Sequence, residues 1–247
     1  MRPDLRQPAD GLHQGVDGGS FRHGDRGQGS GEPVTDTAID LKDGESRIRI
    51  DARETVFSSF RTYDLVTFAE ANEAAGPVEP DDGAPVLTRE LLVTHRTAAV
   101  LPYDQRSGDI ILLRQFRLAA HLRTGRGMMI EIVAGAVDAG EDIEAAALRE
   151  LTEETGLVAE RLHWAADFLP SPGMSDEYAT LFVAPVDATA LHAQAGTDED
   201  ETIFPFRVSL KDAIAAADAG HITNGFTLIA LNWFARHHTR FVDLRDA

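Results

Sequence analysis

The sequence predicts an α/β fold in which a strand-only extension precedes the main domain. Short segments that alternate apolar and polar residues, rich in β-branched and aromatic side chains, recur from Arg47 onward. Segments with helical periodicity are interleaved with the later strands but not with the earliest ones. The 247 residues, 43% of them hydrophobic, fit one domain with appendages better than two full domains.

Residues 1–42 are predicted to form a disordered tail. This segment is crowded with Gly, Pro, Asp and Arg and has almost no aliphatic residues, so it cannot bury enough apolar surface to offset the entropy of ordering. The glycine-rich run at 27–31 is not expected to be a phosphate-binding loop, because no strand precedes it and no Gly-Lys-Ser/Thr follows it.

Residues 43–95 are predicted to form an N-terminal β subdomain. Two or three strands are expected within 47–70, followed by a Pro/Gly/Asp connection at 74–84 and a strand at 87–95.

Residues 96–247 are predicted to form the main domain. Its expected strands lie at 97–104, 109–118, 163–172, 178–186 and 202–209. Its expected helices lie at about 142–155, 209–219 and 226–238.

The charge and composition of the chain exclude several classes of protein. The net charge of −18 argues against a nucleic-acid or anionic-membrane surface, because both partners require a positive face. The chain has no cysteine, which removes disulfides, thiolate metal sites and a cysteine nucleophile. We find no apolar run long enough to span a bilayer and no signal segment, and we expect a cytoplasmic protein.

The stretch "GAVDAGEDIEAAALRELTEETGL" at 135–157 concentrates carboxylates on a predicted helix. Asp142 is placed to cap that helix, and Gly156 to end it. Glu150, Glu153 and Glu154 fall on one side, where like charges at this spacing destabilise a bare helix. They form either a solvated acidic face or a site for a hard divalent cation such as Mg²⁺ or Mn²⁺.

The spacing of this stretch resembles the complete signature of the Nudix hydrolases, with nine fixed positions filled over 23 residues. The positions are Gly135, Glu141, Arg149, Glu150, Leu151, Glu153, Glu154, Gly156 and Leu157. The resemblance implies a Nudix-type α/β/α sandwich that holds divalent metal against a substrate pyrophosphate. It implies that Glu150 and Glu154 are the main metal ligands, with Glu153 adjacent and the carbonyl of Ala134 completing the site. Arg149 is expected to orient a glutamate, and Glu141 to support the loop.

Segments outside this stretch are similar to the ADP-ribose pyrophosphatases within that family. They include "ARETVFSSFRTYDL", "LLRQFRLAA", "EIVAGAVDAGE", "FLPSPGMSDEYATLFVA", "DEDETI" and "HITNGFTLIALNWF", so the similarity extends from about residue 46 to the C-terminus. It implies hydrolysis of ADP-ribose to AMP and ribose 5-phosphate. Arg117 is expected to contact the diphosphate and Glu177 the terminal ribose. Phe60 and Arg89 are expected to bind adenine from the partner subunit of a homodimer with swapped N-terminal strands.

The resemblance leaves the catalytic base and the exact substrate open. The subfamily base matches Glu199, with Glu201 as a further metal ligand, but a shift of two residues exchanges these roles, and Glu153 is the fallback base. Phe60 is alternatively a core residue of a strand, and Arg89 a surface charge. Hydrolysis of another nucleoside diphosphate sugar, such as GDP-mannose or UDP-glucose, is the alternative function. A non-catalytic nucleotide-sugar sensor is the alternative class.

Overall fold

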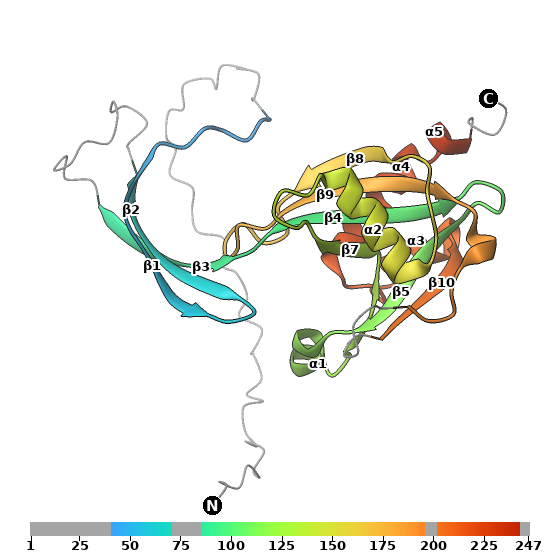
Figure 1. The fold of residues 1–247 in the computed structure, drawn as a ribbon, viewed down its shortest axis with the longest axis horizontal. Helices are drawn as coiled ribbons and strands as arrows, with labels where there is room; N and C mark the ends of the chain where they lie inside the picture. The colour runs from blue at the N-terminus through green and yellow to red at the C-terminus, as the bar shows by residue number, and fades with distance from the viewer. Residues whose placement is uncertain (1–40, 71–84, 196–201, 243–247) are drawn as a thin grey trace, which may run out of the picture. The chain divides into compact units, whose positions relative to one another are not determined.

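The protein is described by a computed structural model, which covers residues 41–70, 85–195 and 202–242 (Figure 1). Helices are interleaved with the strands after the first five strands, so the predicted α/β class is confirmed. Residues 46–247 group into one compact unit. The predicted tail at 1–42 lies almost wholly outside the described residues, and the predicted boundary at 95/96 stays a prediction.

The first three strands form an antiparallel sheet of their own. They are β1 (Ile48–Ser58), β2 (Thr62–Glu70) and β3 (Val86–Val93), in the order β1-β2-β3. The segment 47–70 therefore holds two strands, joined by a turn at 59–61. Large apolar side chains of this sheet are exposed, including Ile50 and Phe57 at 51% and 56%. Packing within this chain therefore does not explain why these positions are apolar.

A second, seven-stranded sheet forms the centre of the main domain. Its continuous path runs β10-β5-β4-β9-β8, and β4 and β9 are parallel while the other pairs are antiparallel. The strands on this path are β4 (Arg96–Asp104), β5 (Asp109–Phe116), β8 (His163–Phe168), β9 (Tyr178–Val186) and β10 (Ile203–Ser209). All five lie within the predicted segments or one residue from them.

The central sheet splits between β4 and β5. These two strands pair only at Tyr103 and Ile110, next to their connecting turn. Further along, β5 pairs with β6 (Met128–Glu131) and β4 pairs with β7 (Val133–Ala136). Helix α1 (Leu118–Thr124) connects β5 to β6. These three short elements were not predicted from the sequence.

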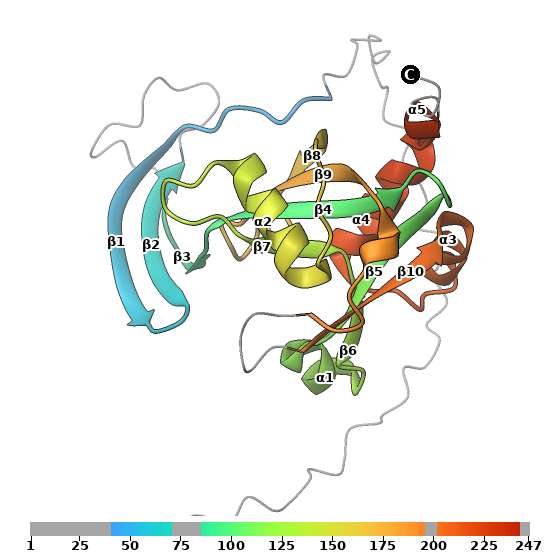
Figure 2. The same ribbon diagram turned by 45° about the vertical axis from the view of Figure 1, so that its right-hand side comes forward.

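Helices cover both faces of this sheet (Figure 2). On one face, α2 (Ile143–Thr155) packs Ala147 and Leu151 into an apolar cluster with residues such as Phe182. On the other face, α3 (Leu210–Asp218) and α4 (Gly225–His237) form a second cluster around Phe234. Two short helices, η1 (Ala188–Ala190) and α5 (Thr239–Val242), complete the described elements. The arrangement is the predicted α/β/α sandwich. No helix in the described part of the chain has the length and apolarity to cross a membrane.

Candidate active site

Helix α2 begins and ends as its sequence predicts. The Asp142 carboxylate caps it by accepting hydrogen bonds from the backbone N–H groups of Glu144 and Ala145. Gly156 ends it with φ of 74°, a left-handed conformation that favours glycine. Ala147 and Leu151 are fully buried, and Glu150 and Glu154, each three residues further along, lie beside this apolar face. The rotation of α2 is thereby fixed by its apolar face.

Glu150 points from α2 to Gly135 in β7. A Cβ atom at Gly135 would lie 2.0 Å from the Glu150 carboxyl carbon, so the absence of a side chain at 135 leaves the space that the carboxylate occupies. Only 12% of the Glu150 side chain is exposed. Burial raises the pKa of Glu150, while a hydrogen bond from Arg149 opposes the shift.

Glu154 reaches the neighbouring residue of β7. Its Oε2 atom accepts a hydrogen bond of 3.2 Å from the backbone N–H of Ala134, and the residue is 8% exposed. Since Ala134 and Gly135 are consecutive, the carboxylates of Glu150 and Glu154 border the same short piece of backbone.

Arg149 binds three carboxylates, one before the helix and two on it. Its Nε and Nη2 atoms donate to the two oxygens of Glu141 at 3.0 and 2.9 Å. Its Nη1 atom donates to Glu150 at 2.7 Å and to Glu153 at 3.2 Å. The hydrogen bonds from Arg149, with one from the backbone of Asp138, lower the pKa of Glu141 to about 2. One guanidinium thus offsets part of the repulsion among three carboxylates.

The donor set at Ala134 and Gly135 fits a hard divalent cation. Within the described ranges, no three His, Asp or Glu side chains are grouped closely enough to hold a metal ion by themselves. Mg²⁺ does not need three side-chain ligands, because it retains several waters and often takes only one or two carboxylates. Glu150 and Glu154 supply two, and a cation there would counter the burial that raises the pKa of Glu150.

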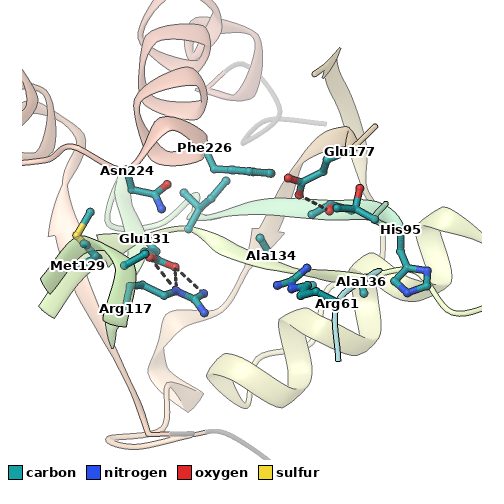
Figure 3. Close-up of a pocket in the computed structure, with 16 residues that line it drawn as sticks. Arg61, His95, Arg117, Met129, Glu131, Ala134, Ala136, Glu177, Asn224 and Phe226 are labelled. Atoms are coloured by element: carbon teal, nitrogen blue, oxygen red, sulfur yellow. Dashed lines mark hydrogen bonds and ion pairs between the residues drawn. The ribbon is translucent and has the colours of Figure 1, made fainter. Parts of the chain in front are cut away.

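A pocket of about 550 Å³ lies at the split between β4 and β5 (Figure 3). Its walls include β7, the end of β6, α1 and the first residues of α4. Three residues predicted for the site line it together, namely Arg117, Ala134 and Glu177. They come from three separate segments, and the divergence of β4 and β5 gives them a common opening.

Two lining residues that the sequence did not single out hold the predicted ones in place. Glu131 at the end of β6 accepts hydrogen bonds from Arg117, and Thr97 of β4 donates one of 2.8 Å to Glu177 (Figure 3). Glu131 begins the segment "EIVAGAVDAGE" that carries the subfamily resemblance, and it is a lone carboxylate in the otherwise apolar run "MMIEIVAGA", but neither feature assigned it a role. Thr97 has no comparable signal.

The other predicted site residues lie elsewhere. Phe60 is 91% exposed at the β1–β2 turn, with the Arg61 guanidinium 5.1 Å from its ring centre, so the alternative that it is a core residue is wrong. Arg89 is exposed on β3 and donates to the carbonyl of Thr88. Neither Phe60 nor Arg89 lines the pocket. Glu199 and Glu201 lie outside the described residues.

Comparison with known families decides what kind of domain carries this site. A family model described as the NUDIX domain matches residues 93–226, which include α2, the pocket strands and the first residues of α4. The chain belongs to the Nudix family. The family and fold predicted from the spacing of the α2 glutamates are therefore confirmed.

Curated relatives of this Nudix protein carry two kinds of name. ADP-ribose pyrophosphatase of Escherichia coli K12 is 33% identical over 196 residues, covering 79% of this chain and 91% of the relative. The protein of the same name from Haemophilus influenzae is 32% identical over 78% of this chain and 88% of the relative. GDP-mannose pyrophosphatase of Citrobacter koseri is 31% identical over 59% of this chain and 76% of the relative.

A solved structure supports the Nudix fold independently. A crystal structure described as an ADP compounds hydrolase superposes with a TM-score of 0.60 and covers 79% of this chain and 96% of its own. Its sequence identity of 19% limits this likeness to the fold.

Proposed function

We propose that this Nudix hydrolase cleaves the pyrophosphate bond of ADP-ribose to give AMP and ribose 5-phosphate, with Mg²⁺ or Mn²⁺ as cofactor. One observation carries the proposal: Glu150 and Glu154 border Ala134 and Gly135 at the wall of a pocket that also presents Arg117 and Glu177. The proposed metal ligands thus lie next to the backbone of a pocket wall, and the pocket itself presents a cation proposed for the diphosphate and a carboxylate proposed for sugar hydroxyls. The two ADP-ribose pyrophosphatases support ADP-ribose as the substrate.

The side chains of the pocket bind and orient the two halves of the substrate. Arg117 binds the diphosphate through charge-assisted hydrogen bonds. Glu177, oriented by Thr97, accepts hydrogen bonds from hydroxyls of the terminal ribose. The divalent cation, held by Glu150, Glu154 and the Ala134 carbonyl, would neutralise charge on the diphosphate oxygens.

A carboxylate outside the α2 cluster takes the proton of the attacking water in this proposal. Glu199 is the proposed base, Glu201 is a further metal ligand, and Glu153 is the alternative base. The deprotonated water attacks the adenosyl phosphorus, the bond to the bridging oxygen breaks, and ribose 5-phosphate leaves with that oxygen. In Glu153, 36% of the side chain is exposed and a hydrogen bond from Arg149 competes for its carboxylate, which favours a base elsewhere.

A second copy of the chain completes the adenine end of the site. Phe60 is 91% exposed and Arg89 lies outside the pocket, while Ile50 and Phe57 of the same sheet are also exposed. Apolar surface of this kind is typical of an interface. We therefore propose a homodimer with swapped N-terminal strands that brings Phe60 and Arg89 to the partner's pocket. Cytoplasmic action stays a prediction from composition.

A hydrolysis screen with Mg²⁺ tests the substrate. It compares ADP-ribose, GDP-mannose, UDP-glucose, NADH and diadenosine polyphosphates, and release of AMP chiefly from ADP-ribose is expected. Dominant cleavage of GDP-mannose would favour the second candidate, which the Citrobacter koseri relative supports. Binding without any cleavage would favour the sensor.

Two glutamine substitutions test the assigned roles. Glu199→Gln is expected to abolish most turnover while leaving substrate binding nearly intact, and unchanged turnover would reassign the base. Glu150→Gln is expected both to slow the reaction and to raise the Mg²⁺ concentration needed for half-maximal rate. An unaltered metal dependence would show that Glu150 is not a ligand.

A further inference from the structure

Glu131 is a buried carboxylate in a place where negative charge is costly. The residue is 6% exposed, and it lines the pocket that, under the proposed function, receives a diphosphate. A buried charge is retained only when it is paired and hydrogen-bonded, and a second anion nearby adds repulsion. Completing the end of β6 therefore does not by itself explain why this position carries a carboxylate.

The pairing between Glu131 and Arg117 has two-point geometry. The Nε atom of Arg117 lies 3.1 and 3.2 Å from the two carboxylate oxygens, and its Nη2 atom donates to Oε2 at 2.9 Å (Figure 3). A guanidinium held along its Nε and Nη2 edge has a fixed plane, which a single contact does not impose. The Arg117 side chain is 44% exposed against 8% for Glu131, so the carboxylate is the fixed partner.

The backbone on both sides of Glu131 is fixed by one buried side chain of α4. The Thr227 hydroxyl donates to the carbonyl of Ile130 at 3.2 Å and accepts from the N–H of Ile132 at 3.1 Å. Thr227 is fully buried. The core of the domain thus fixes the backbone that carries Glu131, and the Glu131 carboxylate in turn fixes the orientation of the Arg117 guanidinium.

We propose that Glu131 is a positioning residue, which orients the Arg117 guanidinium for the substrate diphosphate; this inference rests on the proposed function. An arginine side chain loses rotamer freedom when it binds, and holding it beforehand lowers that cost. The carboxylate alone repels the diphosphate. The effect of Glu131 on binding is therefore favourable with Arg117 present and unfavourable without it.

A double-mutant cycle tests this dependence on Arg117. The variants are E131Q, R117A and the double variant, and the readout is the Kd for ADP-ribose by calorimetry in EDTA, where turnover is suppressed. We expect E131Q to weaken binding about tenfold in the wild-type background, from part of a charge-assisted hydrogen bond. In the R117A background, we expect E131Q to leave binding unchanged or to tighten it. Equal weakening in both backgrounds, or no weakening in either, overturns the proposal.

A second variant tests the geometry without touching the buried carboxylate. Arg117→Lys keeps the positive charge but cannot pair along two parallel N–H groups. It is expected to raise KM about tenfold while kcat changes less than about threefold, because the lost contact binds the diphosphate equally in the ground state and in the transition state. Binding as tight as in the wild type would show that the fixed plane is unnecessary.

Asp104→Asn provides the matched control. Asp104 is also a buried carboxylate beside a half-exposed arginine, with its Oδ2 atom 3.7 Å from Nη2 of Arg207. It ends β4, seven residues and thus about 23 Å along the strand from Thr97, and it does not line the pocket. D104N is expected to lower the Tm without changing the Kd, and an equal loss of binding in D104N overturns the proposal. If the wild type neither binds nor cleaves ADP-ribose, the proposed substrate fails, and the cycle is run on the nucleotide sugar that the screen identifies.

Discussion

Replacing Gly135 with alanine places a methyl group where the Glu150 carboxylate now lies. The added Cβ would be 2.0 Å from the carboxyl carbon and one oxygen, and 2.3 Å from the other oxygen. The backbone itself accepts alanine, because φ at Gly135 is outside the left-handed region. The conflict is therefore confined to one side chain, which is the first proposed metal ligand.

The size of the effect follows from the displacement. The carboxylate must move by about 1.4 Å to reach ordinary contact distance. Overpacking of this kind costs about 1–3 kcal/mol, which lowers the Tm of a domain of this size by about 2–12 °C. A misplacement of about 1 Å in a catalytic group costs on the order of 100-fold in rate. Gly135→Ala is thus expected to lose far more activity than stability.

The assay is a Mg²⁺ titration of ADP-ribose hydrolysis, combined with thermal unfolding in EDTA. The variant is expected to need more Mg²⁺ for half-maximal rate and to lose on the order of 100-fold in kcat/KM. Gly225→Ala is the control, since no heavy atom lies within 4 Å of the added Cβ. The reasoning is refuted if Gly135→Ala keeps the wild-type Mg²⁺ dependence and rate.

Three further predictions concern stability and the adenine end of the site. Glu141→Gln should flatten the pH dependence of the unfolding free energy between about pH 4.5 and 2, measured by urea unfolding. Because the pKa of Glu141 in the folded state is lowered to about 2, the stability that it contributes is present above pH 4.5 and is lost as the pH falls across this range. An unchanged slope in the variant would contradict this prediction. Asp142→Ala should remove the helix cap at a cost of about 1 kcal/mol, seen as a fall in Tm of about 2–4 °C, and an unaltered Tm counts against the cap. Phe60→Ala should raise KM for ADP-ribose about 5- to 150-fold, as loss of base stacking predicts, with no change in Tm because the ring is exposed; a normal KM removes it from the site.

The helix α2 shows how much of the site is local. Asp142 and Gly156 mark its ends, and the buried Ala147 and Leu151 fix its rotation. Glu150 and Glu154 then fall one turn apart by helix geometry alone. These relations depend on residues within one short stretch, so the sequence was sufficient to predict them.

Three elements of the pocket wall, α1, β6 and β7, were not predicted, for a physical reason. Helix α1 buries none of its side chains, so it has no amphipathic pattern to detect. Strands β6 and β7 have four residues each, which is too short for a period of two to stand out. Their existence depends on pairing with β5 and β4, which diverge after a single paired position.

By itself, the sequence determined the family and the carboxylates proposed to bind metal, because their spacing along one helix fixes their relative positions. Only the tertiary structure decided which partners hold the side chains proposed to bind substrate. Glu131 pairs with Arg117 across 14 residues, and Thr97 pairs with Glu177 across 80. Such contacts form where separate strands meet at a split in the sheet, and hydrophobic periodicity carries no information about which strands those are.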